Sequence, residues 1–165
     1  MIYFSKNTIE NFSSESTENA IRKFSAKRNT SLDLKSSSSY TNEDKYFLGL
    51  ESNNDLKITR IRTNFEAFFP KIIVSFPKVH QFEMYKIRFS FLSLVVFIGL
   101  LYALLQSIYI LIVDKEFEND VIPLIISFTV FIVLTIVEIK LTKLKIKKAN
   151  EFFTYMEIGK QIKRN

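Results

Sequence analysis

Residues 89–113 read FSFLSLVVFIGLLYALLQSIYILIV and include no charged side chain. As an α-helix this segment would extend about 37 Å, which exceeds the roughly 30 Å of a bilayer's hydrocarbon core. Residues 121–139, VIPLIISFTVFIVLTIVEI, form a second apolar segment with one charge, the interface residue Glu138, near its end. We therefore expect a hairpin of two transmembrane helices joined by an outside loop over residues 114–120.

The alternative to a membrane hairpin is a pair of buried core helices in a soluble protein. A chain of 165 residues is too short to cover two such helices on every side, which favours the membrane. Asp120 is a suitable N-cap for the second helix, and Pro123 falls in its first turn, where no backbone donor is missed. Pro123 therefore marks a helix start rather than a kink.

Basic residues set the expected orientation of the hairpin. The connecting loop has one lysine and four acidic residues. Basic side chains cluster instead before the first segment and after the second: Lys78, Lys86, Arg88, Lys140, Lys143, Lys145, Lys147 and Lys148. Since positive residues stay on the cytoplasmic side, we expect a multi-pass protein of the inner membrane with both termini in the cytoplasm.

Residues 45–88 are predicted to form a cytoplasmic antiparallel β domain. Aromatic and β-branched residues recur in four short runs that turn-forming residues separate: 45–51, 56–62, 68–76 and 80–88. Short connections between such strands are typical of an antiparallel meander. The last strand leads almost directly into the first apolar segment, which would hold the sheet close to the membrane surface.

Residues 1–44 are predicted to be a polar segment with an amphipathic helix and a serine-rich linker. The apolar stripe of this helix consists of Ile9, Phe12, Ala20, Ile21 and Phe24. Such a helix would lie on a membrane surface or bind a partner, or it would pack on the sheet. Residues 30–35 favour a further short strand, and the four serines at 36–39 favour a linker.

Residues 140–165 are predicted to form a basic cytoplasmic helix and tail. An incomplete apolar stripe runs between the lysines: Leu144, Ala149, Phe152, Phe153 and Met156. The lysines would lie near anionic lipid head groups. The expected fold class is an α+β membrane protein with an N-terminal helix, an antiparallel meander of about four strands, a two-helix transmembrane hairpin and a C-terminal helix.

Three short motifs precede the apolar hairpin: FLG at 47–49, LKITRI at 56–61 and EAFFP at 66–70. They resemble the F-x-G strand, the F-K-I-x-R-I strand and the N-S-F-L-P turn of a group of small uncharacterised two-transmembrane bacterial membrane proteins with a β-rich cytoplasmic domain. Glu66-Ala67 stands where that group usually has Asn-Ser, and Val74 stands near its usual glycine. The resemblance covers residues 45–160 and implies the architecture alone, because the group has no established activity.

The chain lacks the residue types that several kinds of reactive site require. The chain has no cysteine, a single histidine (His80) and three glycines. Disulfides and thiolate chemistry are thereby excluded, and neither a histidine-based dyad nor a glycine-rich phosphate loop is available. The acidic residues have no spacing typical of metal or acid–base sites. We therefore expect no catalytic residue, no metal, no cofactor and no enzyme activity.

Basic side chains around the predicted sheet are the candidate contacts to lipid phosphates or to a protein partner. They are Lys57, Arg60, Arg62, Lys86, Arg88, Lys143 and Lys147. The alternative for the strand residues is an ordinary solvated face. Nucleic acid is not expected as a partner, because a sheet held beside a bilayer favours lipid.

Polar side chains within the first apolar segment are the candidate interhelical contacts. Tyr102, Gln106 and Tyr109 are spaced for one side of a helix. Gln106 would seek a hydrogen-bond partner in lipid, either within the hairpin or in an oligomer.

Three functions are compatible with these patterns. The preferred hypothesis is a non-enzymatic integral membrane protein whose cytoplasmic β domain binds a protein partner or inner-leaflet lipid, in a sensing, scaffolding or regulatory role. The second is a membrane-acting effector, or an immunity protein, that oligomerises through its hairpin. The third is an accessory subunit of a larger membrane complex.

Overall fold

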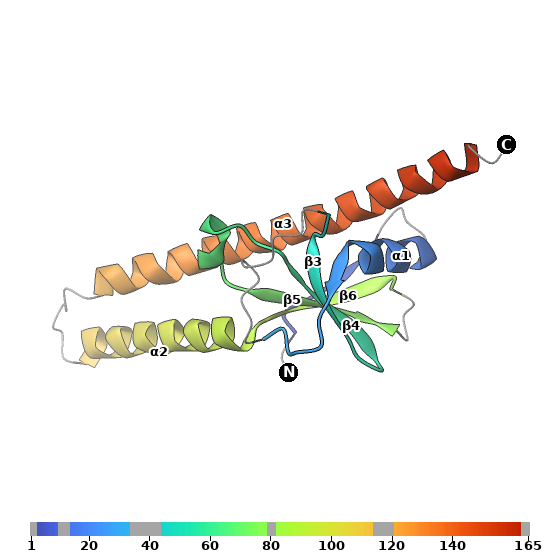
Figure 1. Cartoon of the computed structure of the whole chain (residues 1–165). Coiled ribbons are helices and arrows are strands. Elements are labelled where there is room, and N and C mark those ends of the chain that lie inside the picture. The colour runs from blue at the N-terminus through green and yellow to red at the C-terminus, as the bar shows by residue number, and fades with distance from the viewer. Residues whose placement is uncertain (1–2, 10–13, 34–43, 79–81, 114–120, 163–165) are drawn as a thin grey trace.

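The computed structural model describes residues 3–9, 14–33, 44–78, 82–113 and 121–162, which form an α+β fold (Figure 1). Its strands are β1 Ser5–Thr8, β2 Ser25–Lys27, β3 Phe47–Glu51, β4 Asp55–Arg60, β5 Ile72–Pro77 and β6 Met84–Phe89. Its helices are α1 Ser14–Phe24, the 3₁₀ turn η1 Phe65–Phe68, α2 Phe91–Val113 and α3 Val121–Ile162.

The strands form one six-stranded sheet in the order β1-β6-β5-β4-β3-β2. β2 runs parallel to β3, and the other neighbouring pairs are antiparallel. β3 to β6 follow one another as a meander, so the four-stranded prediction matches only roughly: the sheet is mixed and has an added strand at each edge. Both added strands come from the first 44 residues. Residues 30–33 form a turn instead of the expected strand, and 34–35 lie outside the described residues.

The main core lies between the sheet and the helices α1 and α3. Ile58, Val74 and Ile87 are direct neighbours across β4, β5 and β6, and all three are fully buried. They belong to one cluster with Ile21 of α1 and Ile146 of α3. A smaller cluster consists of Ala26, Leu32, Leu48 and Ile73. The sheet therefore buries its main apolar face against helices.

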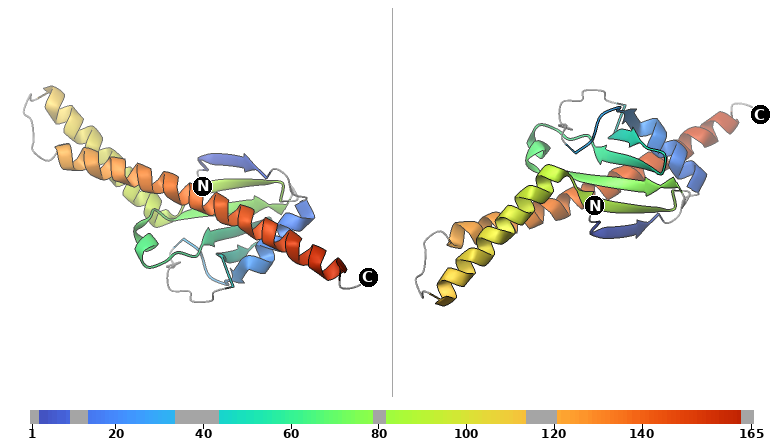
Figure 2. Two further views of the ribbon diagram at one scale, coloured as in Figure 1. Left: turned by 90° about the horizontal axis from the view of Figure 1, so that it is seen from above. Right: turned by 90° about the horizontal axis from the view of Figure 1, so that it is seen from below.

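Helix α1 is part of this core. Ala20 and Ile21 are fully buried, and Phe24 stacks on Tyr46 with ring centroids 4.9 Å apart. α1 also packs beside α3 (Figure 2). Of the two interpretations of the amphipathic helix, the structure supports packing on the sheet domain. The predicted stripe was too long, because Ile9 follows β1 and lies outside the helix; Phe12 lies outside the described residues.

Helices α2 and α3 form the predicted apolar hairpin. They lie side by side (Figure 1), and Phe97 of α2 packs against Phe128 and Phe131 of α3, with ring centroids 6.0 Å apart in both cases. α3 continues for 42 residues, about 63 Å, and crosses the sheet domain toward the C-terminus (Figure 2). The second apolar segment and the predicted C-terminal helix are thus one continuous helix.

Candidate functional site

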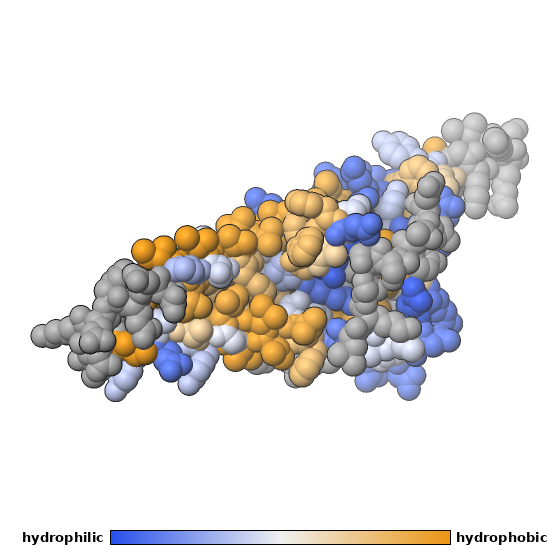
Figure 3. Space-filling model, turned by 60° about the vertical axis from the view of Figure 1, so that its left-hand side comes forward, coloured by the Kyte–Doolittle hydropathy of each residue, from blue (hydrophilic) through white to orange (hydrophobic). Residues whose placement is uncertain are grey.

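The surface of the hairpin is apolar and open. Phe91–Ile110 and Val121–Ile158 each contain a stretch long and apolar enough to cross a membrane, and only 6% and 17% of those stretches are buried. Figure 3 shows the apolar side chains covering the hairpin end and the hydrophilic ones gathering over the sheet end. Core helices of soluble proteins are mostly buried, and these two are not.

The start of α2 is fixed to the sheet domain by capping contacts. Ser90 caps the helix: its carbonyl accepts from the Leu94 N–H at 2.9 Å. Asp33 Oδ1 accepts from the Phe91 N–H at 3.0 Å, and Arg88 donates to both Asp33 oxygens at 2.7 and 2.9 Å. The bond from Arg88, together with that from the Phe91 amide, holds the pKa of Asp33 below its ordinary value against the opposing effect of burial.

Lys71 supports the same helix start from the neighbouring strand connection. Its backbone N–H donates to Ser93 Oγ at 2.7 Å, and its carbonyl accepts from the Ser90 N–H at 2.9 Å. Its buried Nζ donates to the Leu32 carbonyl. Burial, assisted by the nearby charge of Arg62, lowers the pKa of Lys71 to about 8.

A second set of contacts joins the sheet to α3. Arg60 Nη2 donates to Glu138 Oε2 at 2.6 Å, and Arg60 Nη1 donates to Glu66 Oε1 at 2.9 Å. Arg60 and Glu138 are only 3% and 1% exposed. Arg62 is also buried, and it donates to the Phe69 carbonyl. We call the two sets together the junction, which consists of Asp33, Arg60, Glu66, Lys71, Arg88 and Glu138.

Two aromatic side chains project beside the junction. Phe65 and Phe68 of η1 are 78% and 82% exposed, so they contribute little to the core. Glu66, between them, shares Arg60 with Glu138, which places η1 beside the part of α3 where the apolar segment ends (Figure 1). If the apolar part of α3 spans a bilayer, the two exposed rings would lie near its surface.

Three of the seven basic residues predicted to contact lipid or a partner are buried rather than exposed. Arg60, Arg62 and Arg88 are buried. Arg60 donates to Glu138, Arg62 donates to the Phe69 carbonyl, and Arg88 donates through Nη1 and Nη2 to Asp33. Arg60 ties the sheet to α3 through Glu138, and Arg88 holds Asp33 at the start of α2. A contact of these arginines to lipid phosphates or to a partner stays a prediction. The sequence around Arg60 does not predict that it is buried in an ion pair, because its partner Glu138 lies 78 positions away.

Two other candidates, Lys57 and Lys86, lie in one row across the sheet. Lys57 is opposite Ser75, Ser75 is opposite Lys86, and Lys86 is opposite Lys6. Direct neighbours in such a row project from the same face, here the face away from α3. Lys57 pairs with Asp55 at 3.5 Å. Together with exposed Lys6, these side chains form a row of three lysines, which we call the lysine row.

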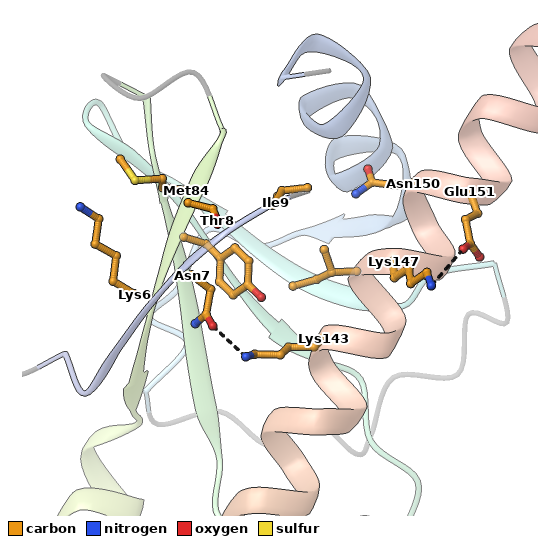
Figure 4. A pocket seen from close by; sticks show the side chains of 11 residues that line it. Lys6, Asn7, Thr8, Ile9, Met84, Lys143, Lys147, Asn150 and Glu151 are labelled. Carbon is orange, nitrogen blue, oxygen red and sulfur yellow. Dashed lines mark hydrogen bonds and ion pairs between the residues drawn. The ribbon is translucent and has the colours of Figure 1, made fainter. Parts of the chain in front are cut away.

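The last two basic candidates, Lys143 and Lys147, line an open cavity of about 930 Å³ between α3 and the β1–β6 edge (Figure 4). Lys143 Nζ donates to Asn7 Oδ1 at 2.7 Å. Lys147 lies 3.8 Å from Glu151. Asn150, which also lines the cavity and is fully buried, is not among the residues predicted from the sequence.

The three candidate interhelical residues face outward. Tyr102 and Tyr109 are 67% and 64% exposed, and Gln106 is exposed between them on α2. They lie outside the contact between α2 and α3. A contact to another helix or to lipid therefore stays a prediction.

In the part of the chain that the structure describes, no group of three His, Cys, Asp or Glu side chains could hold a metal ion. No family model matches the chain, and no curated protein or solved structure matches it either. Fold and site together define an α+β protein with an exposed apolar hairpin whose helices could cross a membrane, built directly onto a small sheet domain.

Proposed function

We propose that this is a non-enzymatic integral membrane protein that holds a binding domain at the inner face of the cytoplasmic membrane. α2 and the apolar part of α3 span the bilayer, and both termini lie in the cytoplasm. The sheet domain binds a protein partner or inner-leaflet lipid in a sensing, scaffolding or regulatory role.

The observation that carries this proposal is the junction. β6 ends at Phe89 and α2 begins at Phe91, so no linker separates the sheet from the hairpin. The buried pair of Arg60 and Glu138 ties the same sheet to α3. A domain attached at two points to an apolar anchor has a fixed height above the bilayer, which suits recognition at the membrane surface.

Cysteine labelling tests the membrane part, because the chain has no cysteine of its own. Asn119→Cys lies in the expected outside loop, and Ser37→Cys lies in the expected cytoplasmic linker. A membrane-impermeant maleimide should label Asn119→Cys on intact spheroplasts and should label Ser37→Cys only after lysis. The reverse pattern would invert the topology, and labelling of both variants in a soluble fraction would refute the membrane anchor.

Pull-down in a mild detergent, followed by native mass spectrometry, tests the binding role. The first variant carries two substitutions in the lysine row, Lys57→Glu and Lys86→Glu. The control variant is Lys148→Glu, which is exposed on α3. A partner lost only with the first variant would support recognition by the sheet. A partner retained by both variants would contradict it.

A second candidate, supported by the outward-facing Tyr102, Gln106 and Tyr109, is a subunit of an oligomer or of a larger membrane complex. A stoichiometric foreign membrane protein in the same pull-down would favour the complex. A homo-oligomer that dissociates with Gln106→Leu would favour self-association, and a membrane-depolarisation assay would then test the effector hypothesis.

A further inference from the structure

The cavity beside α3 contains an unusual polar group. Asn150 is fully buried, and neither Oδ1 nor Nδ2 has a hydrogen-bond partner. Its side chain points from α3 toward β1 at the inner wall of the cavity (Figure 4). Burying an amide without a partner costs free energy, so native proteins do it rarely. Both amide atoms are closed off from solvent in this structure, so a ligand in the cavity supplies the missing partner once the side chain turns outward.

The other side chains in the cavity indicate the charge of that ligand. Lys143 points across the cavity toward Asn7 of β1, and Lys147 lies along α3 at the rim, paired with Glu151 (Figure 4). Both pairs involve exposed lysines, and such contacts are weak in water. Lysine is a common ligand of phosphate groups, so an anion can compete with Asn7 and Glu151 for the two ammonium groups.

The position of the cavity along α3 indicates where the ligand comes from. If the apolar segment ends at Ile139, Lys143 lies about 6 Å and Asn150 about 16 Å farther along the helix. The head-group layer of a bilayer extends roughly 5–8 Å beyond the hydrocarbon on each side. Lys143 is then at the level of lipid phosphates, whereas Asn150 lies about 8 Å beyond the head-group layer, so a lipid must rise partly out of the bilayer for its head group to reach the amide.

We propose that this cavity binds a phosphate-bearing anionic ligand, with Lys143 and Lys147 on the phosphate and the Asn150 amide on a neutral hydroxyl or carbonyl of the same molecule. The volume of about 930 Å³ is sufficient for a lipid head group and its first bonds. The inference deepens the proposed function, on which it relies for the level of the bilayer.

The test is the thermal unfolding of the full chain in an uncharged detergent, titrated with dihexanoyl phosphatidylglycerol, dihexanoyl phosphatidylcholine, glycerol 3-phosphate or inorganic phosphate. A ligand that binds the folded state raises the unfolding temperature in a saturable way. Saturation with the phosphatidylglycerol alone identifies a lipid head group as the source. Saturation with glycerol phosphate or inorganic phosphate as well identifies a soluble phosphate. No saturation with any of these probes overturns the proposal.

Two variants and two controls separate the site from general charge attraction. Asn150→Leu should weaken binding about tenfold without lowering the unfolding temperature of the free protein, because leucine removes an unpartnered amide at similar volume. Lys143→Gln should weaken binding to a similar extent. Lys148→Gln, on the same helix outside the cavity, and Thr17→Val, a buried hydroxyl outside it, should leave binding unchanged.

Equal losses with Lys148→Gln, or unchanged binding with Asn150→Leu, would overturn the assignment of the site. Because the titration is done in micelles, it does not depend on membrane orientation. Failure of the ligand site would leave the cysteine-labelling pattern intact, and failure of the membrane anchor would appear in the labelling alone.

Discussion

Arg60 and Glu138 are 78 positions apart in the sequence, yet their side chains form a hydrogen-bonded ion pair at 2.6 Å with almost no exposure to solvent. One residue belongs to the end of β4 and the other to α3, just where the apolar segment of α3 ends. The pair is therefore one of the two attachments between the sheet and the hairpin.

Removal of one partner of this pair should destabilise the domain strongly. Arg60→Met leaves the Glu138 carboxylate buried without its main partner, and losses of about 3–5 kcal/mol are typical for such a change. Urea unfolding in detergent, followed by circular dichroism, measures the free energy of unfolding. The double variant Arg60→Met with Glu138→Leu should recover most of the loss, since it leaves no buried charge unpaired.

Lys57→Met is the matched control for that experiment. Lys57 pairs with Asp55 at 3.5 Å near the surface, so its loss should cost less than about 1 kcal/mol. If Lys57→Met and Arg60→Met were equally destabilising, the buried pair would have no special part in holding the domain.

Asp33 should make the domain sensitive to acid. Its pKa in the folded state is lowered, so its stabilising contribution is present above the ordinary pKa near 3.9 and is lost as the pH falls through the folded value. Asp33→Asn keeps an oxygen for the Phe91 N–H but removes the charge. The variant should have a lower unfolding temperature than the parent protein at pH 7, and the difference should shrink as the pH falls through the folded pKa of Asp33. A difference that stays constant down to that pH would contradict this account.

Lys71 should make the stability of the domain depend on pH in the alkaline range. With a folded pKa of about 8, the folded state loses the proton first, while the unfolded chain keeps it up to about pH 10.4. The unfolded state then binds more protons, so stability should rise between pH 8 and 10, by up to roughly 3 kcal/mol. Lys71→Met should flatten this rise. A rise of equal size in the variant would assign it to another group.

Phe65 and Phe68 should lie in the membrane–water interface. The chain has no tryptophan, so Phe65→Trp introduces a single fluorescent reporter. In nanodiscs, its emission should be quenched by lipids brominated near the carbonyl region. Tyr155→Trp, exposed near the far end of α3, should not be quenched. No quenching at Phe65→Trp would place η1 away from the bilayer, and equal quenching at the two positions would show that the two sites do not differ in depth as expected.

Much of the architecture is predictable from local sequence. The apolar segments 89–113 and 121–139 correspond to α2 and the first part of α3, and the four runs between 45 and 88 correspond to β3 to β6. The edge strands β1 and β2 were missed, because SKNT and SAK are short and polar and have no alternating pattern. They form only because the neighbouring strands β6 and β3 offer backbone partners.

The site was harder to predict than the fold. Arg60 and Arg88 were identified as basic residues near the membrane, but burial depends on partners, and Glu138 and Asp33 are distant in the sequence. Asn150 had a faint signal: it directly follows Ala149 on the buried side of a helix whose other faces are rich in lysine. Only the packed structure shows that its amide has no partner.

The continuity of α3 has a mechanical consequence. The helix extends about 35 Å beyond Ile139, so a rotation of about 10° displaces its far end by roughly 6 Å. Helix tilt in a bilayer adjusts to the thickness of the hydrocarbon layer. α1 and the main face of the sheet pack on this part of α3, and the cavity opens beside it. If α3 spans a bilayer as proposed, a change in its tilt would move its C-terminal end.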